Sequence, residues 1–118
     1  MNKKRLLKNL LTVENLASSS KIKRMMNNPV KYLNAILFRE LTYKSNKKPR
    51  LVRTTTFFGR PMSVLLPSST DIYLTGGKSH SSEIRLARFI IKHLNEGDFF
   101  VDVGAHYGYF TQLASCIV

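Results

Sequence analysis

Cysteine is almost absent from this 118-residue chain: Cys116 stands alone, so an internal disulfide framework is excluded. We therefore expect a reducing compartment, the cytoplasm. A hydrophobic run of the ~20 residues that a bilayer-spanning helix needs is also missing. The N-terminus is basic, but Lys8, Asn9 and Glu14 interrupt any signal-peptide core. The sequence thus predicts a soluble cytoplasmic protein with no transmembrane segment.

Motifs for metal or phosphate chemistry are missing too. The chain has no cysteine and histidine cluster at zinc-binding spacing and no complete G-x-x-x-x-G-K-[S/T] phosphate loop. His106 has no sequence partner that would mark it as a general base. The sequence therefore predicts no metal site and assigns no catalytic residue. Its apolar content of 43% is nevertheless that of a globular protein.

Acidic residues are scarce, and the net charge of +12 is unevenly distributed. Residues 1–60 contain fifteen Lys and Arg against Glu14 and Glu40, whereas residues 61–118 contain four against five acids. A solvated basic surface is the interpretation we favour for the first half. The alternative is a basic helical module that binds a polyanion, either nucleic acid or an anionic surface, beside a relic cofactor loop.

The most informative stretch is Gly97–Thr111, which reads Gly-Asp-Phe-Phe-Val-Asp-Val-Gly-Ala-His-Tyr-Gly-Tyr-Phe-Thr. Its apolar start predicts a strand over Phe99–Val103, buried on both faces as in a parallel sheet. Asp102 would then lie at the carboxyl end of that strand, where open α/β sheets bind their ligands. Gly104 and Gly108 allow a tight turn, and the following helix directs free N–H groups toward the ligand. The pattern predicts a nucleotide-type cofactor loop.

The spacing Asp102-x-Gly104-x-x-x-Gly108 lacks the middle glycine of the dinucleotide fingerprint G-x-G-x-x-G. It resembles the first motif of class I S-adenosylmethionine (SAM) methyltransferases. With Tyr109-Phe110-Thr111 included, the sequence of this motif resembles that of the FkbM family of methyltransferases, and the resemblance covers the last third of the chain. An NAD-binding loop is the alternative, disfavoured by the missing glycine and by the acid at Asp102.

The resemblance implies SAM as the cofactor, with Asp102 orienting the amino group of its methionyl part. FkbM members usually have Asn where this chain has His106. Glu83 and His80 could reach the cofactor from the preceding segment, although a plain helix start explains Glu83 equally well. Tyr107 and Tyr109 are interpreted as wall and core residues. The predicted cofactor-binding residues are Asp102, Gly104, Ala105, His106, Gly108 and Glu83.

The basic half of the chain is predicted to be helical. A first helix over Lys3–Ala17 carries an apolar stripe that packs on the body of the protein. Asn28-Pro29 begins another helix, which runs to about Tyr43. Its apolar residues are predicted to form its buried face: Val30, Leu33, Ile36, Leu37 and Leu41.

The second half is predicted to mix strands and helices. Leu51–Phe57 and Met62–Leu66, on either side of Gly59, predict a β-hairpin. Asp71–Thr75 predicts a third short strand, and Ser82–Asn95 predicts a helix. The polar stretch before Pro49 divides a basic helical region, residues 1–48, from a SAM-binding region, residues 49–118.

The predicted fold class is α/β: helices and a hairpin lead into the first β-α unit of an incomplete Rossmann-like class I sheet. Val118 follows the loop closely, so the neighbouring strands of that sheet are expected beyond it. We expect the chain to be the N-terminal part of a longer SAM-dependent methyltransferase, inactive alone. By resemblance, the acceptor is a hydroxyl group of a sugar, a polysaccharide precursor or another small polar molecule.

Overall fold

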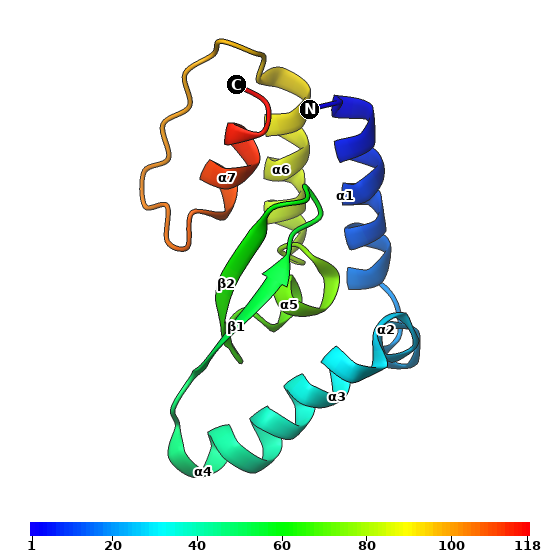
Figure 1. Ribbon diagram of the computed structural model, residues 1–118. Coiled ribbons are helices and arrows are strands. Elements are labelled where there is room, and N and C mark those ends of the chain that lie inside the picture. The colour runs from blue at the N-terminus through cyan, green and yellow to red at the C-terminus, as the bar shows by residue number, and fades with distance from the viewer.

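The computed structural model describes residues 1–118 and places helices around one β-hairpin (Figure 1). The structure confirms an α/β fold with a two-stranded antiparallel sheet. A Rossmann-like sheet stays a prediction. The elements in order are α1 (Lys3–Ala17), α2 (Lys21–Asn27), α3 (Pro29–Leu37), the π-helical segment η1 (Phe38–Tyr43), α4 (Lys44–Asn46), β1 (Arg50–Thr55), β2 (Pro61–Leu66), α5 (Thr70–Thr75), α6 (Ser81–His93) and α7 (Tyr109–Ser115).

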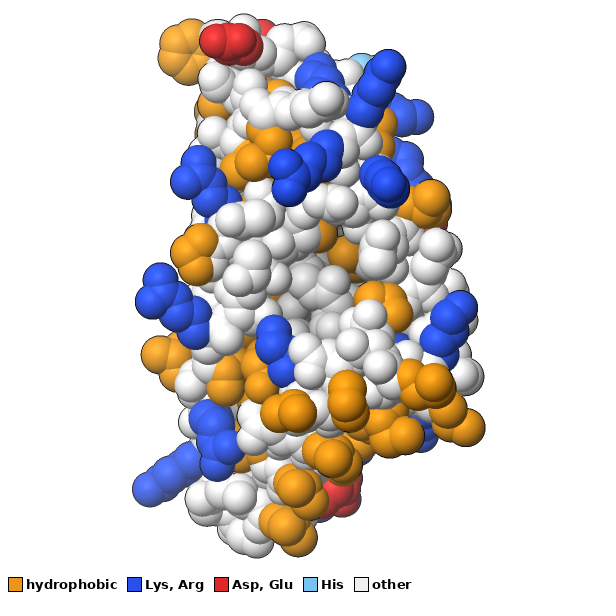
Figure 2. Space-filling view, turned by 45° about the vertical axis from the view of Figure 1, so that its right-hand side comes forward, with side chains coloured by type: hydrophobic (Ala, Val, Ile, Leu, Met, Phe, Trp, Pro, Cys, Tyr) orange, Lys and Arg blue, Asp and Glu red, His pale blue; other side chains and the backbone are white.

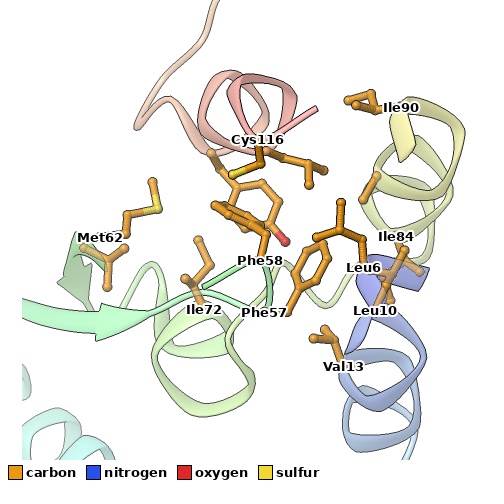
Figure 3. Packing of buried hydrophobic residues seen from close by; sticks show 14 of the residues in the cluster. Leu6, Leu10, Val13, Phe57, Phe58, Met62, Ile72, Ile84, Ile90 and Cys116 are labelled. Atoms are coloured by element: carbon orange, nitrogen blue, oxygen red, sulfur yellow. The ribbon is translucent and has the colours of Figure 1, made fainter. Parts of the chain in front are cut away.

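Helices α1 and α6 lie side by side and supply much of the core (Figure 1). Asn2 caps α1 by accepting a hydrogen bond from the Lys4 backbone N–H at 2.9 Å, as expected of a helix start. The predicted α1 stripe is buried, and α6 faces it with its own apolar side (Figure 3). The buried residues are Leu6, Leu10 and Val13 of α1 and Ile84, Ala87, Ile90 and Ile91 of α6.

The hairpin forms where the sequence predicts it. β1 and β2 pair antiparallel, with Arg50 opposite Leu66 and Thr55 opposite Pro61. Met62, Val64 and Leu66 are buried, whereas Pro61 and Ser63 are exposed and Leu65 is half-buried. This alternation turns one face of β2 to the core.

The third predicted strand, Asp71–Thr75, is wrong: the segment is the short helix α5. Asp71 in the first turn favours a helix, since its carboxylate suits the positive end of the helix dipole. Gly76 ends the helix at φ +79°, a left-handed conformation that favours glycine. A segment of six residues is too short for its apolar pattern to distinguish a helix from a strand.

The predicted strand Phe99–Val103 is also wrong. The segment is extended but makes no backbone hydrogen bond to another part of the chain. Phe99, Val101 and Val103 are exposed by 98%, 81% and 92%. Figure 1 shows the segment arching outward between α6 and α7. A buried strand needs neighbours on both sides, and the only strands present pair with each other.

The predicted buried face of the helix after Asn28 is likewise wrong. Val30, Leu33, Leu37 and Leu41 are exposed by 51–76%, and Ile36 is only half-buried. The residues that α3 and η1 bury are instead Ala35 and Phe38. Periodicity identified an apolar face correctly, but the core of the protein lies against a different face.

The boundary predicted near Pro49 is crossed by tertiary contacts. Glu14 of α1 forms an ion pair with Arg88 of α6, and Lys3 donates a hydrogen bond to Asn95 at 2.9 Å. A single cluster of 21 buried hydrophobic residues includes members from both predicted regions. Helix α1 therefore shares its core with residues 49–118.

Candidate functional site

The predicted cofactor loop is an irregular turn between the extended segment and α7. Gly104 and Gly108 adopt left-handed backbone conformations, with φ of +73° and +74°. His106 between them is also left-handed, at φ +53°, which is uncommon for a residue with a Cβ atom. A Cβ atom built on either glycine would meet no atom within 4 Å. These glycines therefore serve the backbone conformation and leave open space beside the loop.

Asp102 is held against the first turn of α7. Its Oδ2 atom accepts a hydrogen bond from the Thr111 hydroxyl at 2.6 Å. No other hydrogen bond involves this carboxylate, so its Oδ1 atom is available to a ligand. Thr111 thus fixes the carboxylate at the entrance of the loop.

Ala105 and His106 form the outer part of the loop. The exposed His106 ring packs edge-on against Tyr107, with ring centroids 4.0 Å apart and an interplanar angle of 80°. The Tyr107 hydroxyl lies 3.4 Å from that of Ser68, so the loop contacts the turn after β2. No carboxylate approaches His106, and nothing in the structure marks it as a base.

Tyr109, the first residue of α7, anchors the loop to the core. Its side chain is buried, and its hydroxyl accepts a hydrogen bond from the Lys78 backbone N–H at 3.2 Å. Its ring meets Phe58 in a T-shaped contact, with ring centroids 5.6 Å apart. Burial, with smaller contributions from Asp71 and Glu83, raises the pKa of this phenol well above its usual range.

We expect Tyr109→Phe to lower the free energy of unfolding by about 1–2 kcal/mol at neutral pH, because the Lys78 N–H loses its partner. The raised pKa has a further consequence. Above about pH 10 the unfolded chain ionises its tyrosine while the native chain keeps the proton, so stability falls as the pH rises.

The Tyr109→Phe variant should lose part of this alkaline destabilisation, measured by urea unfolding between neutral pH and about pH 11. Tyr32→Phe, at a hydroxyl without a hydrogen bond, is the control and should keep it. An equal pH dependence of the unfolding free energy in the two variants would contradict the attribution of the alkaline destabilisation to Tyr109.

Glu83 lies in the first turn of α6 and is not brought to the loop. Its carboxylate pairs with the Lys78 ammonium at 2.8 Å, and no contact joins it to residues 102–108. His80 caps the same helix, with its Nδ1 atom accepting from the Ser82 backbone N–H at 3.3 Å. Both residues therefore have structural roles in the helix start. A cofactor contact from Glu83 stays a prediction.

The loop lies in the acidic part of a basic protein. Glu96, Asp98 and Asp102 are the ionisable side chains of the segment before it, and no Lys or Arg follows Lys92. Loop and extended segment are open to solvent: none of the four pockets of the structure is lined by residues 98–108. The site thus offers a free carboxylate oxygen and accessible backbone to a ligand that carries positive charge.

Two features elsewhere escaped the sequence analysis. Lys21, Arg24 and Arg39 line a pocket of about 310 Å³ together with residues of α3 and α5. The Arg24 Nε atom is buried there without a hydrogen-bond partner. The second feature is the outward position of the α3 leucines. Neither has a local sequence signal, because both depend on how α3 is rotated about its axis.

The structure has no group of three or more His, Cys, Asp or Glu residues placed to hold a metal ion. None of its helices combines the length and hydropathy that crossing a membrane requires. Comparisons with protein-family models, curated proteins and solved structures find no match to this chain. The function must therefore be argued from the loop itself.

Proposed function

We propose that residues 99–111 form the SAM-binding loop of a methyltransferase similar to the FkbM family. The observation that carries the proposal is the Asp102 carboxylate. Thr111 bonds one of its oxygen atoms, and the other has no hydrogen-bond partner. Two glycines in left-handed conformations, Gly104 and Gly108, follow Asp102 in the chain. By resemblance to the FkbM family, this acid would orient the amino group of SAM, and a free carboxylate oxygen suits an ammonium group.

Local charge favours SAM over NAD at this loop. SAM carries a sulfonium and an ammonium against one carboxylate, whereas the pyrophosphate of NAD is anionic. Glu96, Asp98 and Asp102 make the segment itself negative. The structure brings Lys3 to Asn95 at its start and Lys78 to within 5.9 Å of the Phe110 ring centroid at its end, and Lys78 is already paired with Glu83. An anionic cofactor would meet repulsion here, and a cationic one would meet attraction.

SAM would supply a methyl group activated by its sulfonium, and the proposed acceptor is a hydroxyl of a sugar or another small polar molecule. The contribution of this loop would be to hold the cofactor in place, since the one side chain bonded to Asp102 is Thr111, whose hydroxyl is not a base. Orientation of the two reactants would then be the main source of rate enhancement.

We test the proposal by titrating the full chain with millimolar SAM and following its backbone amides by NMR. The amides of Gly104, His106 and Gly108 are expected to shift. Asp102→Asn should weaken the response at least about fivefold, because an amide no longer attracts the ammonium group. Asp98→Asn, a matched change in the same segment, should leave it within about twofold.

Larger shifts with NAD than with SAM would overturn the proposal, as would equal losses in Asp98→Asn and Asp102→Asn. Shifts confined to residues outside the loop would do the same. The readout does not depend on turnover, so it tests cofactor binding by this chain directly.

A further inference from the structure

Helix α3 faces the body of the protein with polar side chains beside the buried Ala35. The Lys31 ammonium donates hydrogen bonds to the Thr54 hydroxyl at 2.9 Å and to the Tyr73 carbonyl at 3.4 Å. The Asn34 amide donates to the Tyr73 hydroxyl at 3.0 Å. Burial lowers the pKa of Lys31, which shows that the inward position desolvates its charge. Polar contacts therefore account for much of how α3 docks on β1 and α5.

The outward face of the same helix is apolar. Val30, Leu33, Leu37 and Leu41, which we call the apolar stripe, are exposed by 76%, 51%, 53% and 69%. Their spacing of three and four residues places them on one face of α3 and η1. Figure 2 shows hydrophobic side chains gathered over the lower part of the molecule. On the neighbouring helix α2, Ile22 and Met26 are also exposed.

Single exposed leucines are ordinary, but an apolar stripe along a helix whose polar side is turned inward is not. The usual arrangement buries the apolar side because burial of a leucine is worth about 1.5–3 kcal/mol. In the isolated chain the stripe residues are exposed, so their burial does not contribute to stability. The stripe is therefore suited to an external apolar environment.

The surroundings of the stripe are strongly basic. Residues 21–48 contain eight Lys and Arg against Glu40 alone, a net charge of +7. Arg39 and Lys44 share that one carboxylate, so the other six lack an acidic partner. Three of the eight cations, Lys21, Arg24 and Arg39, line the pocket between α2, α3 and α5. Three cationic side chains around one pocket make it receptive to an anionic oxygen.

We propose that the apolar stripe and its basic surroundings dock on the surface of an anionic phospholipid membrane. The stripe would enter the boundary between headgroups and acyl chains, with α3 parallel to the surface. The lysines and arginines would contact lipid phosphates and carboxylates, and the pocket would receive one headgroup. Apolar residues on one face and many cations beside it are the two features of helices that bind at membrane interfaces.

Two other occupants fit the observations less well. A second copy would bring a face of charge +7 against its equal, which opposes association. Nucleic acid would match the charge but would leave the four stripe residues exposed, since its contacts are chiefly phosphate contacts. The proposal does not involve the cofactor loop, so membrane binding can be tested separately from SAM binding and methyl transfer.

The first experiment is co-sedimentation of the full chain with vesicles of phosphatidylcholine alone or phosphatidylcholine mixed with phosphatidylserine. We expect binding to the mixed vesicles only, weakened by salt. The double variant Leu33→Ser/Leu37→Ser should lower the partition coefficient at least about tenfold. The matched control Leu11→Ser/Leu86→Ser changes exposed leucines of α1 and α6 and should stay within about twofold.

A second measurement uses the absence of tryptophan from the chain. Val30→Trp places a single indole on the stripe, and its emission should shift to shorter wavelength on mixed vesicles. Leu86→Trp on α6 should show no shift. This readout locates the contact without removing any leucine of the apolar stripe.

Equal binding to both vesicle types, or unchanged binding by Leu33→Ser/Leu37→Ser, would overturn the proposal. RNA binding without vesicle binding would assign the basic surface to nucleic acid instead. A dimer that dissociates in Leu33→Ser/Leu37→Ser and does not bind vesicles would identify a second copy as the occupant. A blue shift at Leu86→Trp equal to that at Val30→Trp would show that the stripe is not the docking face.

Discussion

Phe58→Ala is expected to lower the free energy of unfolding by about 3–5 kcal/mol, because it deletes a large aromatic side chain from the core. The Phe58 side chain is 1% exposed. Its ring packs edge-on against Phe57, with centroids 5.1 Å apart, and against Tyr109 at 5.6 Å. Truncation would remove both contacts and leave a cavity between the hairpin turn and α7. Since small domains are stable by only about 5–15 kcal/mol, much of the stability would be lost.

Phe99→Ala provides a matched control with the same change of side chain. Phe99 is 98% exposed, so we expect a change within about 0.5 kcal/mol. Urea unfolding of the two variants and the parent chain measures both effects. A large cost for Phe99→Ala would show that the extended segment is buried in solution, as the sequence alone predicted. A small cost for Phe58→Ala would contradict the observed core.

Gly77→Ala is expected to cost about 1–3 kcal/mol through overpacking. A Cβ atom at this position would lie 2.9 Å from the Tyr109 hydroxyl oxygen and 3.0 Å from Cγ1 of Val13. Both neighbours are buried, so neither can move away without disturbing the core. Gly77 thus lets α1 and α7 approach the same short turn.

A double-mutant cycle identifies which neighbour carries the cost. In the Tyr109→Phe background the hydroxyl is absent, and Gly77→Ala should cost less than in the parent chain. An unchanged cost would assign the clash to Val13 or to the backbone. Thermal and urea unfolding of the four proteins complete the cycle.

The elements that the sequence predicted correctly depend on local signals. Asn2 caps α1 at the predicted start, and the strands beside Gly59 pair as a hairpin because they are close in sequence. The helix predicted over Ser82–Asn95 corresponds to α6, Ser81–His93. Each of these predictions needed only periodicity, caps or turn residues within about fifteen positions.

The predictions that failed needed information about distant neighbours. Phe99–Val103 has the composition of a buried strand, but a strand requires partners to which its backbone can bond. The apolar residues of α3 have helical spacing, but the face that turns inward is the one that buries Ala35 and bonds Lys31 to Thr54 and Asn34 to Tyr73. Periodicity gives the faces of a helix and does not say which one meets the core.

The candidate site was predictable in part. The turn at Gly104 and Gly108 and the start of α7 follow from the positions of the glycines. The distance between Asp102 and Thr111 required the structure, since they lie nine positions apart across an irregular turn and the start of α7. Glu83 was placed near the loop by resemblance, and its ion pair with Lys78 is a contact that sequence spacing did not reveal.

The packing of α1 on α6 has a consequence for the order in which the chain can fold during synthesis. Helix α1 ends at Ala17 and its partner α6 begins at Ser81. At about 5–20 residues per second, the ribosome needs several seconds to make the intervening chain. Throughout that interval Leu6, Leu10 and Val13 have no α6 to cover them, and α1 is exposed as a nascent amphipathic helix. The nascent chain therefore presents an apolar helix face to chaperones before its native partner exists.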